Sequence, residues 1–471
     1  MLEIAGFIFF LAVFAGIGLW SNKKRTSAGN DYLLAGQTVN PLLTALSAAA
    51  TKYSGYMFIG LIGYIYTYGI SAICLICGFL FGDVIAYSFV HRHLRQATED
   101  TKVSTFAELL SRWHSGSYRY LRIAVGILTL IFLCTYAGAQ LNAGGKALYA
   151  IFGWPTVSGA LIGAGLILVY CLFGGLRASI WTDAAQSILM MTAILLLLIS
   201  AIVHVGGVTV FVEKLKLVEP GYLDPGVTRF GSIQATLLFA FGWLFNGIGV
   251  TGQPQVMIRF MALDKTEHIK KTGFLYFLWS GSFLLAILGV GLATRLYITQ
   301  ASGFDPELAL PELSQILMPG LAVGVILGGV FAASMSTTDS QVLSCSAVLS
   351  EDFNLWKGAN GKRISTLIIT IGSLAIALFA TASVFNLVIF AWTALACSIG
   401  PLVIIHALGA RPREWLCFLM MLVGMTVAFS WRASGLGQQF YEGAPGILSA
   451  LATFGVLRLI LKDKAASPAK N

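Results

Sequence analysis

Apolar runs of about 20 residues recur along the whole chain, and they leave little room for any fold except a bundle of membrane-spanning helices. A helix of this length crosses a hydrocarbon core of roughly 30 Å. Of the 471 residues, 57% are hydrophobic and 11% are charged, and the mean hydropathy is +0.81. Soluble domains carry roughly a quarter charged residues. The sequence therefore predicts an all-α membrane protein.

The breaks between the apolar runs predict thirteen transmembrane helices. These spans are 3–21, 40–67, 69–91, 120–148, 156–175, 181–205, 232–258, 269–298, 313–349, 363–382, 385–407, 414–431 and 441–461. The longest connections, 92–119 and 206–231, are too short for a sizeable soluble domain. The first segment lacks a basic start, so we expect it to remain as a membrane helix rather than to be cleaved as a signal peptide.

Basic residues predict the orientation. With the amino terminus outside, 23 of the 30 Lys and Arg residues fall in inner loops or the carboxyl-terminal tail, six fall outside, and Lys52 lies within a span. Lys and Arg concentrate in cytoplasmic loops. We expect the amino terminus outside and the carboxyl terminus inside, and this bias explains the net charge of +9 without a nucleic-acid partner.

Two blocks of five spans begin on opposite sides of the membrane, at 40–205 and 232–407. Each block opens with an interrupted helix, "SAAATKYSG" at 47–55 and "NGIGVTGQP" at 246–254. Paired interrupted segments of this kind indicate a transporter with a midplane site. A channel has less support, because no filter-like loop or ring of like charges is visible.

The rest of the domain organisation follows from these two repeats. We expect an extra amino-terminal helix and a basic loop in 1–39, and an extracellular loop in 206–231. Two further helices and a short cytoplasmic tail occupy 408–471.

Polar groups at the first break predict a cation site. Carbonyls of Ala50 and Tyr53 are candidate ligands, and "AASMSTTDSQ" at 332–341 adds the hydroxyls of Ser336 and Thr337 and the carbonyl of Ala333. Neutral oxygens suit a small hard cation that must also leave. The alternative is that the hydroxyls only tie helices together, for about 0.6 kcal/mol each.

Ionisable residues inside apolar segments are expensive, at roughly 2.5–3.5 kcal/mol for a charge at the bilayer centre. Lys52 is therefore a candidate functional residue, and so are Asp83, Asp183 and Asp339. Asp183 and Asp339 have the alternative of lying at helix ends in water. Asp83 is flanked by apolar residues on both sides, and its structural alternative is a hydrogen bond to a Ser or Tyr of a neighbouring helix.

The seven cysteines lie in or beside apolar segments and predict no disulfide framework. Cys74 and Cys77 form a CxxC in "ICLIC", which favours helix packing over metal binding because the setting is apolar. No nucleophile and base, metal cluster or phosphate-binding loop is apparent. We expect no enzymatic activity.

Four runs resemble the solute:sodium symporter family, and most closely its bacterial proline and pantothenate symporter branch. They are "TALSAAATKYSGYMFIGLIG" (44–63), "FGGLRASIWTDAAQ" (173–186), "GQPQVMIRFMA" (252–262) and "MSTTDSQVLSCSAVLSED" (335–352). The resemblance implies a LeuT-type fold, with a five-plus-five inverted repeat, one helix before it and two after. It also implies a bacterial-type cytoplasmic (inner) membrane location.

The resemblance also implies roles for individual residues. The family's sodium site falls on Ala50, Tyr53, Ala333, Ser336 and Thr337, the positions already singled out.

Coupling and substrate binding are implied at further positions. Asp183 matches an acid near the ion path, and Ser54 matches a serine linked to ion and substrate binding. Tyr136 and Pro254 match positions that line the proline pocket. We add Gln140, Trp243 and Asn246 as candidate substrate-binding residues.

Two departures from the proline branch bear on the substrate. Lys52 stands where that branch has an essential aspartate, and Asn246 and Val250 stand where it has an aromatic pair before "GQP". The pocket is therefore not built like a proline pocket, and proline is not the expected substrate.

Lys52 carries a fixed positive charge beside the family's sodium site. One hypothesis is that it replaces Na⁺ in whole or part, pairing with Asp183 or with Ser336 and Thr337, and that it couples transport to H⁺. The alternative is that Lys52 points away and Na⁺ binds normally.

The resulting functional prediction is a secondary active transporter in the lipid bilayer. It would import a small polar organic solute, of amino acid or carboxylate type, by cation-coupled symport. Na⁺ is the cation favoured by the family, with a proton or no ion as the alternatives. A transporter-like membrane sensor is the rival class, although the tail "LKDKAASPAKN" is too short for a fused signalling domain. The oligomeric state stays open.

Overall fold

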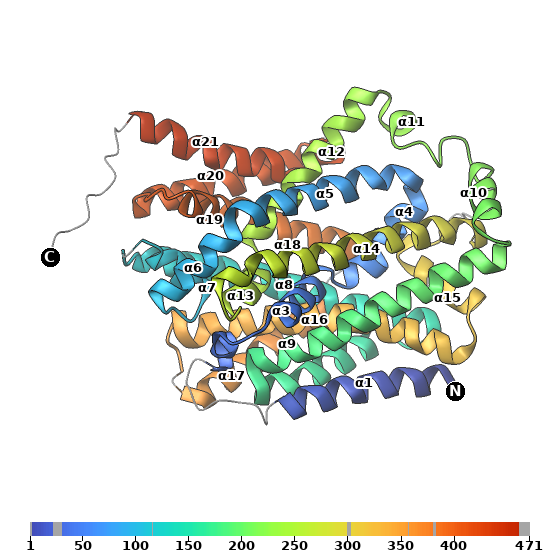
Figure 1. The fold of residues 1–471 in the computed structure, drawn as a ribbon, viewed down its shortest axis with the longest axis horizontal. Helices are drawn as coiled ribbons and strands as arrows, with labels where there is room; N and C mark the ends of the chain where they lie inside the picture. Colours follow the sequence, from blue (N-terminus) through green and yellow to red (C-terminus); the bar gives the residue numbers. More distant parts are fainter. Residues whose placement is uncertain are drawn as a thin grey trace.

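The computed structural model describes residues 2–21, 31–114, 116–298, 303–356, 358–379 and 383–460. Helices make up nearly all of the regular structure in these ranges, with one isolated β-bridge between Val39 and Leu263. Figure 1 shows the long helices running side by side across the view, with the start of α1 and the end of α21 at opposite ends of the bundle. Parts of the predicted basic loop (22–30) and tail (461–471) lie outside the described residues.

The α-helices of the described residues are α1 (Leu2–Ser21), α2 (Asp31–Leu34), α3 (Pro41–Lys52), α4 (Ile62–Tyr68), α5 (Ala72–Ala86), α6 (Arg92–Thr101), α7 (Phe106–Arg112), α8 (Arg119–Phe152), α9 (Thr156–Val205), α10 (Val208–Lys216), α11 (Val227–Phe230), α12 (Ile233–Ile248), α13 (Pro254–Met261), α14 (Ile269–Tyr297), α15 (Ala309–Leu317), α16 (Gly320–Ala347), α17 (Gly358–Phe379), α18 (Val384–Ser398), α19 (Gly400–Ala407), α20 (Glu414–Ala433) and α21 (Gly443–Ile460). Short 3₁₀ turns are η2 (Ala35–Gln37), η4 (Gly69–Ser71), η6 (Gly249–Gly252), η7 (Thr266–His268), η8 (Pro306–Leu308) and η10 (Leu436–Gln438). The π-helical turns are η3 (Met57–Leu61), η5 (Tyr87–His91) and η9 (Val348–Asp352).

Within the described ranges, 11 helical stretches are long and apolar enough to cross a membrane. They are Leu2–Ser21, Met57–Thr101, Arg119–Phe152, Gly174–Val205, Ile233–Gly252, Thr266–Tyr297, Gly320–Asp352, Asn360–Phe379, Val384–Ala407, Glu414–Ala433 and Gly443–Ile460.

The sequence predicts thirteen spans, and two stretches account for the difference. Met57–Thr101 is one stretch of 45 residues where the sequence predicts the end of one span and the whole of the next. Helix α9 (Thr156–Val205) covers two predicted spans with a break at Gly175 (φ 56°), and in its first half the apolar segment Thr156–Val169 is shorter than the 11 stretches.

The first predicted break is confirmed in position. Helix α3 begins at Pro41, after Asn40 accepts a hydrogen bond from a backbone N–H of the first turn, and it ends at Lys52. Pro at the first position and Asn before it are favourable start signals. Tyr53 then has φ −88° and ψ 78°, which is not helical. The chain returns to helix directly afterwards, so the break exposes backbone groups in the middle of the bundle.

The second predicted break is also confirmed. Helix α12 ends at Ile248, the turn η6 covers Gly249–Gly252, and α13 begins at Pro254. Gln253 has φ −100° and ψ 96°, and its amide donates to the carbonyl of Trp392 at 3.0 Å. The two interrupted helices therefore have the same construction, a short non-helical link between two helical halves.

Close packing brings α5 against α12. A Cβ atom at Gly82 would lie 1.9 Å from the carbonyl oxygen of Leu244, and one at Gly247 would lie 2.1 Å from that of Phe79. Small residues permit such approaches between membrane helices. This contact places side chains of α5 and α12 around the same inner cavity.

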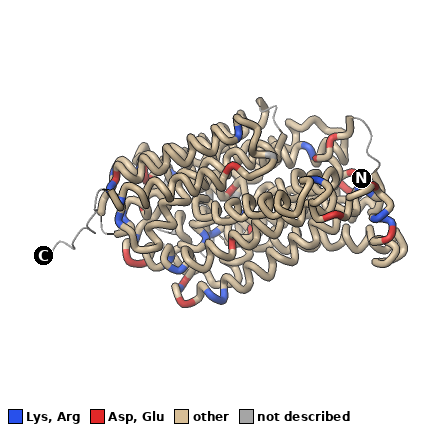
Figure 2. The backbone as a smooth tube through the Cα atoms, turned by 90° about the horizontal axis from the view of Figure 1, so that it is seen from above, with Lys and Arg blue, Asp and Glu red and all other residues tan. Residues whose placement is uncertain are grey.

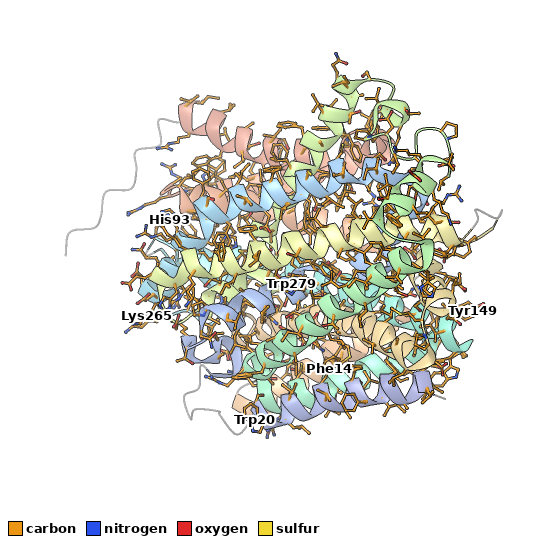
Figure 3. All side chains as sticks on the ribbon, turned by 45° about the vertical axis from the view of Figure 1, so that its right-hand side comes forward. Phe14, Trp20, His93, Tyr149, Lys265 and Trp279 are labelled. Atoms are coloured by element: carbon orange, nitrogen blue, oxygen red, sulfur yellow. The ribbon has the colours of Figure 1, made fainter. Side chains whose placement is uncertain are left out.

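Charged residues concentrate at the two ends of the bundle, with a few in its middle (Figure 2). In Figure 3, Lys265 and His93 lie at one end, Tyr149 at the other, and Trp279 between them. Many large apolar side chains are exposed on the outer helices, for example Phe81 (65%) and Phe9 (61%). An apolar exterior suits contact with lipid, and it makes the few charges in the middle stand out.

Candidate functional site

The break after α3 faces the polar segment of α16. Ser336 donates a hydrogen bond from Oγ to the carbonyl oxygens of Ala50 (2.9 Å) and Ala333 (3.1 Å). Thr337 donates from Oγ1 to the carbonyl oxygens of Thr51 (3.0 Å) and Ala333 (3.1 Å). All five residues are buried. Four of the five predicted ion ligands therefore lie together.

Tyr53, the fifth predicted ligand, follows α3 directly and is fully buried. Its ring packs against Phe79, Trp279 and Phe283, with centroids 5.8–6.1 Å away. The neutral carbonyl and hydroxyl oxygens at this break are of the kind that a Na⁺ ion requires. The donor set therefore fits a small hard cation.

A second polar network lies on the same side of α3, closer to its start. Arg259 of α13 contacts Asp183 of α9 (3.1 Å), and it donates to the hydroxyls of Ser179 (2.6 Å) and Ser47 (3.3 Å) and to the carbonyl of Gln255 (3.3 Å). Ser47 in turn donates to Asp183 at 2.7 Å. The guanidinium group thus links α13 to α3 and α9.

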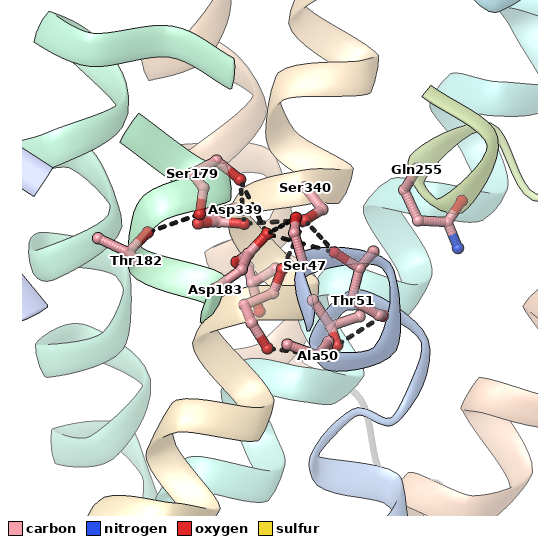
Figure 4. A network of polar contacts seen from close by, with 12 residues as sticks. Ser47, Ala50, Thr51, Ser179, Thr182, Asp183, Gln255, Asp339 and Ser340 are labelled. Carbon is pink, nitrogen blue, oxygen red and sulfur yellow. Dashed lines mark hydrogen bonds between the residues drawn. The ribbon is translucent and has the colours of Figure 1, made fainter. Parts of the chain in front are cut away.

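Helix α16 joins this network through Asp339 and Ser340. Ser179 and Ser340 donate to Asp339 at 3.1 and 2.9 Å, and Ser340 also contacts Thr51 at 3.0 Å and accepts from Arg259. Figure 4 shows Asp183, Asp339 and Ser340 at the centre of these contacts. The alternative that the two acids lie at helix ends in water is wrong, since both side chains are fully buried beside a guanidinium group.

The sequence does not identify Arg259 as a candidate site residue. By the positive-inside pattern it belongs to the inner loops, but its side chain is fully buried in the structure. The signal that could have found it is its setting within α13, "PQVMIRFM", where the neighbouring positions are apolar. A lone arginine in such a segment requires buried partners.

Lys52 points to a different side of α3. Its ammonium group forms an ion pair with Asp83 of α5, and Tyr276 of α14 donates to the same carboxylate oxygen at 2.8 Å. The ring centre of Phe79 lies 4.0 Å from the ammonium nitrogen. All four side chains are buried.

The hypothesis that Lys52 pairs with Asp183, or with Ser336 and Thr337, is therefore wrong. The reason is helical geometry, because consecutive residues on an α-helix point about 100° apart. Thr51 faces α9 and α16, so Lys52 faces α5. The alternative for Asp83, a hydrogen bond to a Tyr of a neighbouring helix, is confirmed by Tyr276.

A small inner cavity of about 20 Å³ lies beside Lys52. Its lining includes three of the predicted substrate residues, Tyr136, Trp243 and Asn246. The complete lining is Lys52, Tyr56, Met57, Leu61, Leu75, Ile76, Phe79, Tyr136, Trp243, Asn246, Leu284, Val388, Ile389 and Trp392. Aromatic walls with a few polar groups are typical of small-molecule sites.

The other three predicted substrate residues do not line this cavity. Ser54 lies within hydrogen-bonding distance of Tyr136, at 3.4 Å between the hydroxyl oxygens. Gln140 is fully buried next to Gly55, behind the cavity wall. Pro254 lines a separate, smaller space with Ile258. Five of the six therefore group near the first break, and Pro254 does not.

A larger vestibule of about 680 Å³ opens next to the inner cavity and shares Trp243 and Ile389 with it. Its charged lining residues are Arg229, Asp305, Glu307, Arg432 and Glu442. Ion pairs hold most of them. Lys146 binds Asp305 (2.9 Å) and Glu307 (2.6 Å), and Arg432 binds Glu442 (3.1 Å). A polar path thus leads from one end of the bundle to the apolar inner cavity.

Proteins similar in sequence are transporters. The high-affinity proline transporter PutP of Bacillus subtilis is 30% identical over 91% of this chain and 92% of its own length. The sodium/proline symporter of Escherichia coli strain K12 is 28% identical over 98% of this chain and 92% of its own length.

Solved structures agree on the fold. The substrate-bound outward-open state of a Na⁺-coupled sialic acid symporter matches 98% of both chains with a TM-score of 0.82 at 19% identity. MhsT in complex with L-phenylalanine matches 91% of this chain and 99% of its own, with a TM-score of 0.51 at 14% identity. The protein is thus an all-helical, multi-pass membrane protein whose structural neighbours have the LeuT-type fold.

The model of the sodium:solute symporter family matches residues 32–424, which is most of the chain. The family is one of symporters, the similar proteins are transporters, and one of the two structural neighbours is a Na⁺-coupled symporter. Sequence motifs, helix arrangement and the polar sites at the breaks lead to the same conclusion: the chain belongs to the sodium:solute symporter family.

Proposed function

We propose that the protein imports a small polar organic solute, of amino acid or carboxylate type, together with Na⁺. The ion would bind at the oxygens of Ala50, Tyr53, Ala333, Ser336 and Thr337. The solute would bind in the inner cavity, near Ser54, Tyr136, Trp243 and Asn246. Gln140 would act from behind these residues, whereas Pro254 lines a separate space and would not contact the solute in this cavity.

The observation that most supports Na⁺ is the direction of Lys52. Its ammonium group pairs with Asp83 on α5, while the hydroxyls of Ser336 and Thr337 contact only neutral carbonyl oxygens. A cation bound between these oxygens would draw the break of α3 toward α16. The replacement of sodium by Lys52, and coupling to H⁺ through it, has no such support.

The five-plus-five inverted repeat and the thirteen spans remain part of this proposal. So do the orientation, with the amino terminus outside, and the bacterial inner-membrane location. The opposite positions of the α1 start and the α21 end support termini on different sides of the membrane. In that orientation the vestibule opens outward, and a solute would pass Trp243 and Ile389 to reach the inner cavity.

Alternating access requires the vestibule and the opposite face to open in turn. The Arg259 network would close the inner side in this structure, because it joins α3, α9, α13 and α16 beneath the break. Asp183 would couple that closure to the ion, since it contacts Ser47 and Thr51 on the helix that ends at the ion site.

A pair of neighbouring threonines offers a test. Thr337 contacts α3 across the ion site, whereas Thr338 donates only to Ser334 within its own helix. We expect Thr337→Ala to lower the apparent Na⁺ affinity at least tenfold, because one of about five oxygen ligands is lost. Thr338→Ala, the matched control, should leave it unchanged.

The measurement is the melting temperature of the purified protein in NaCl and in choline chloride at equal ionic strength. A ligand that binds only the folded state raises its melting temperature. The ion assignment is wrong if Na⁺ gives no stabilisation, or if both variants respond to Na⁺ as the unmodified protein does.

A further inference from the structure

We propose that Lys52 is the anchor for a carboxylate group of the substrate, and that Asp83 holds the ammonium group in place for it. This inference rests on the solute site proposed above and narrows its substrate class. The ligand would be a small carboxylate with a compact, mainly apolar body.

Lys52 is the one charged side chain among the described residues that line the inner cavity. The other lining groups are aromatic or aliphatic, apart from the Asn246 amide and the hydroxyls of Tyr56 and Tyr136. A ligand charge buried in such a space requires a group of opposite charge. The lining therefore selects for a negative group and against a positive one.

The ammonium group has bonding capacity to spare. It carries three N–H donors, and within the described part of the chain the hydrogen-bond acceptor that it contacts is one oxygen of Asp83. The rings of Phe79 (4.0 Å), Tyr53 (5.1 Å) and Tyr276 (5.7 Å) surround it. Aromatic faces attract a cation without accepting a conventional hydrogen bond. A ligand oxygen can thus be added without displacing Asp83.

The other side chains that line the cavity determine the chemical character of the rest of the ligand. Aliphatic side chains of Leu75, Ile76, Leu284 and Val388 suit an apolar body. The cavity is small in this structure, about 20 Å³, so the ligand body beyond the carboxylate must be compact and the walls must part to admit it. A charge-assisted hydrogen bond to Lys52 would distinguish a carboxylate from its neutral amide of the same shape.

Charge balance is consistent with symport. Lys52 and Asp83 together are neutral, so a monocarboxylate adds one negative charge to the bundle. One Na⁺ at the break of α3 would offset it. The loaded protein would then carry the same net charge through the membrane as the empty protein.

A purely structural ion pair is the competing explanation, and a charge-free double variant separates the two. Lys52→Met together with Asp83→Asn removes both charges and leaves Tyr276 a neutral partner. If the pair only supports the fold, the double variant should still bind ligands. If Lys52 is the anchor, the double variant should fold and lose selection for carboxylates.

The probes are matched pairs of carboxylates and neutral amides, from acetate and acetamide through propionate and propionamide to butyrate and butyramide, each measured by thermal shift in NaCl. We expect carboxylates to stabilise the unmodified protein and their amides not to do so. In the double variant the carboxylate affinity should fall at least tenfold, while the Na⁺-dependent shift persists.

Several outcomes would overturn the anchor. They are equal stabilisation by amides, no stabilisation by any carboxylate of the panel, or carboxylate binding that survives in the double variant. If the double variant does not fold, the carboxylate-to-amide ratio of the unmodified protein decides. Failure of the symport proposal looks different, because the carboxylate selection would then remain without any dependence on Na⁺.

Discussion

Two buried ion pairs lie on different faces of the same broken helix, and they are built in different ways. The guanidinium of Arg259 is surrounded by three serine hydroxyls, a carbonyl and the carboxylate of Asp183. The ammonium of Lys52 has one carboxylate partner and a shell of aromatic rings. An arginine that shares its donors among so many acceptors is fixed in place, whereas a lysine with spare donors can still bind a ligand. The difference separates a closing contact from a binding contact.

The largest expected effect comes from removing the cation of the polar network. Arg259→Met would remove the positive charge that contacts the buried carboxylates of Asp183 and Asp339, at a cost of about 3–5 kcal/mol in stability. Melting temperature and the yield of folded protein in detergent measure it. Lys265→Met, at an exposed position, is the control and should change neither. A loss below about 1 kcal/mol would mean that the network does not hold these helices together.

A smaller effect is expected on the other face of α3. Lys52→Met should destabilise the protein by about 3 kcal/mol, since Asp83 then keeps only Tyr276 as a hydrogen-bond donor. Adding Asp83→Asn should recover most of that loss. A double-mutant cycle of melting free energies measures the coupling. Additive losses would show that the two residues do not interact in the folded protein.

The smallest expected effect comes from removing the hydroxyl of Tyr276. Tyr276→Phe removes one hydrogen bond to a carboxylate and should lower stability by about 1.5–3 kcal/mol. Tyr297→Phe removes a bond of 2.7 Å to a neutral carbonyl, that of Ala201, and should lower it by about 0.5–1.5 kcal/mol. Chemical denaturation of the two variants tests the ranking. Equal losses would indicate that the bond from Tyr276 to Asp83 is no stronger than a bond to a neutral carbonyl.

Much of the site could be predicted from the sequence because it depends on local chemistry. Pro41, the small residues before Lys52 and the Gly-rich link before Pro254 specify where the two helices are interrupted. The hydroxyl pair Ser336 and Thr337 stands out in an otherwise apolar segment. Such features can be recognised in the sequence because a polar group inside a membrane segment costs free energy unless it has a hydrogen-bond partner.

The ion-pair partners of Lys52 and Arg259 could not be predicted from the sequence in the same way. Asp83 and Asp183 are both acids in apolar segments, and the sequence offers no reason to prefer either for Lys52. The Arg259 side chain looks like part of an inner loop by its charge alone. Each pairing depends on the direction in which a side chain leaves its helix and on which helix packs there.

The sequence by itself determined that this chain is a bundle of membrane helices, that two of them are broken, and which polar residues the breaks contain. Hydrophobic length, backbone breakers and the cost of buried charge are properties of short segments. Only the tertiary structure decided that Lys52 binds Asp83 and that Arg259 binds Asp183. Consecutive residues of an α-helix point about 100° apart, so Thr51 and Lys52 contact different helices. Only the packing of the helices decides which helix each side chain contacts.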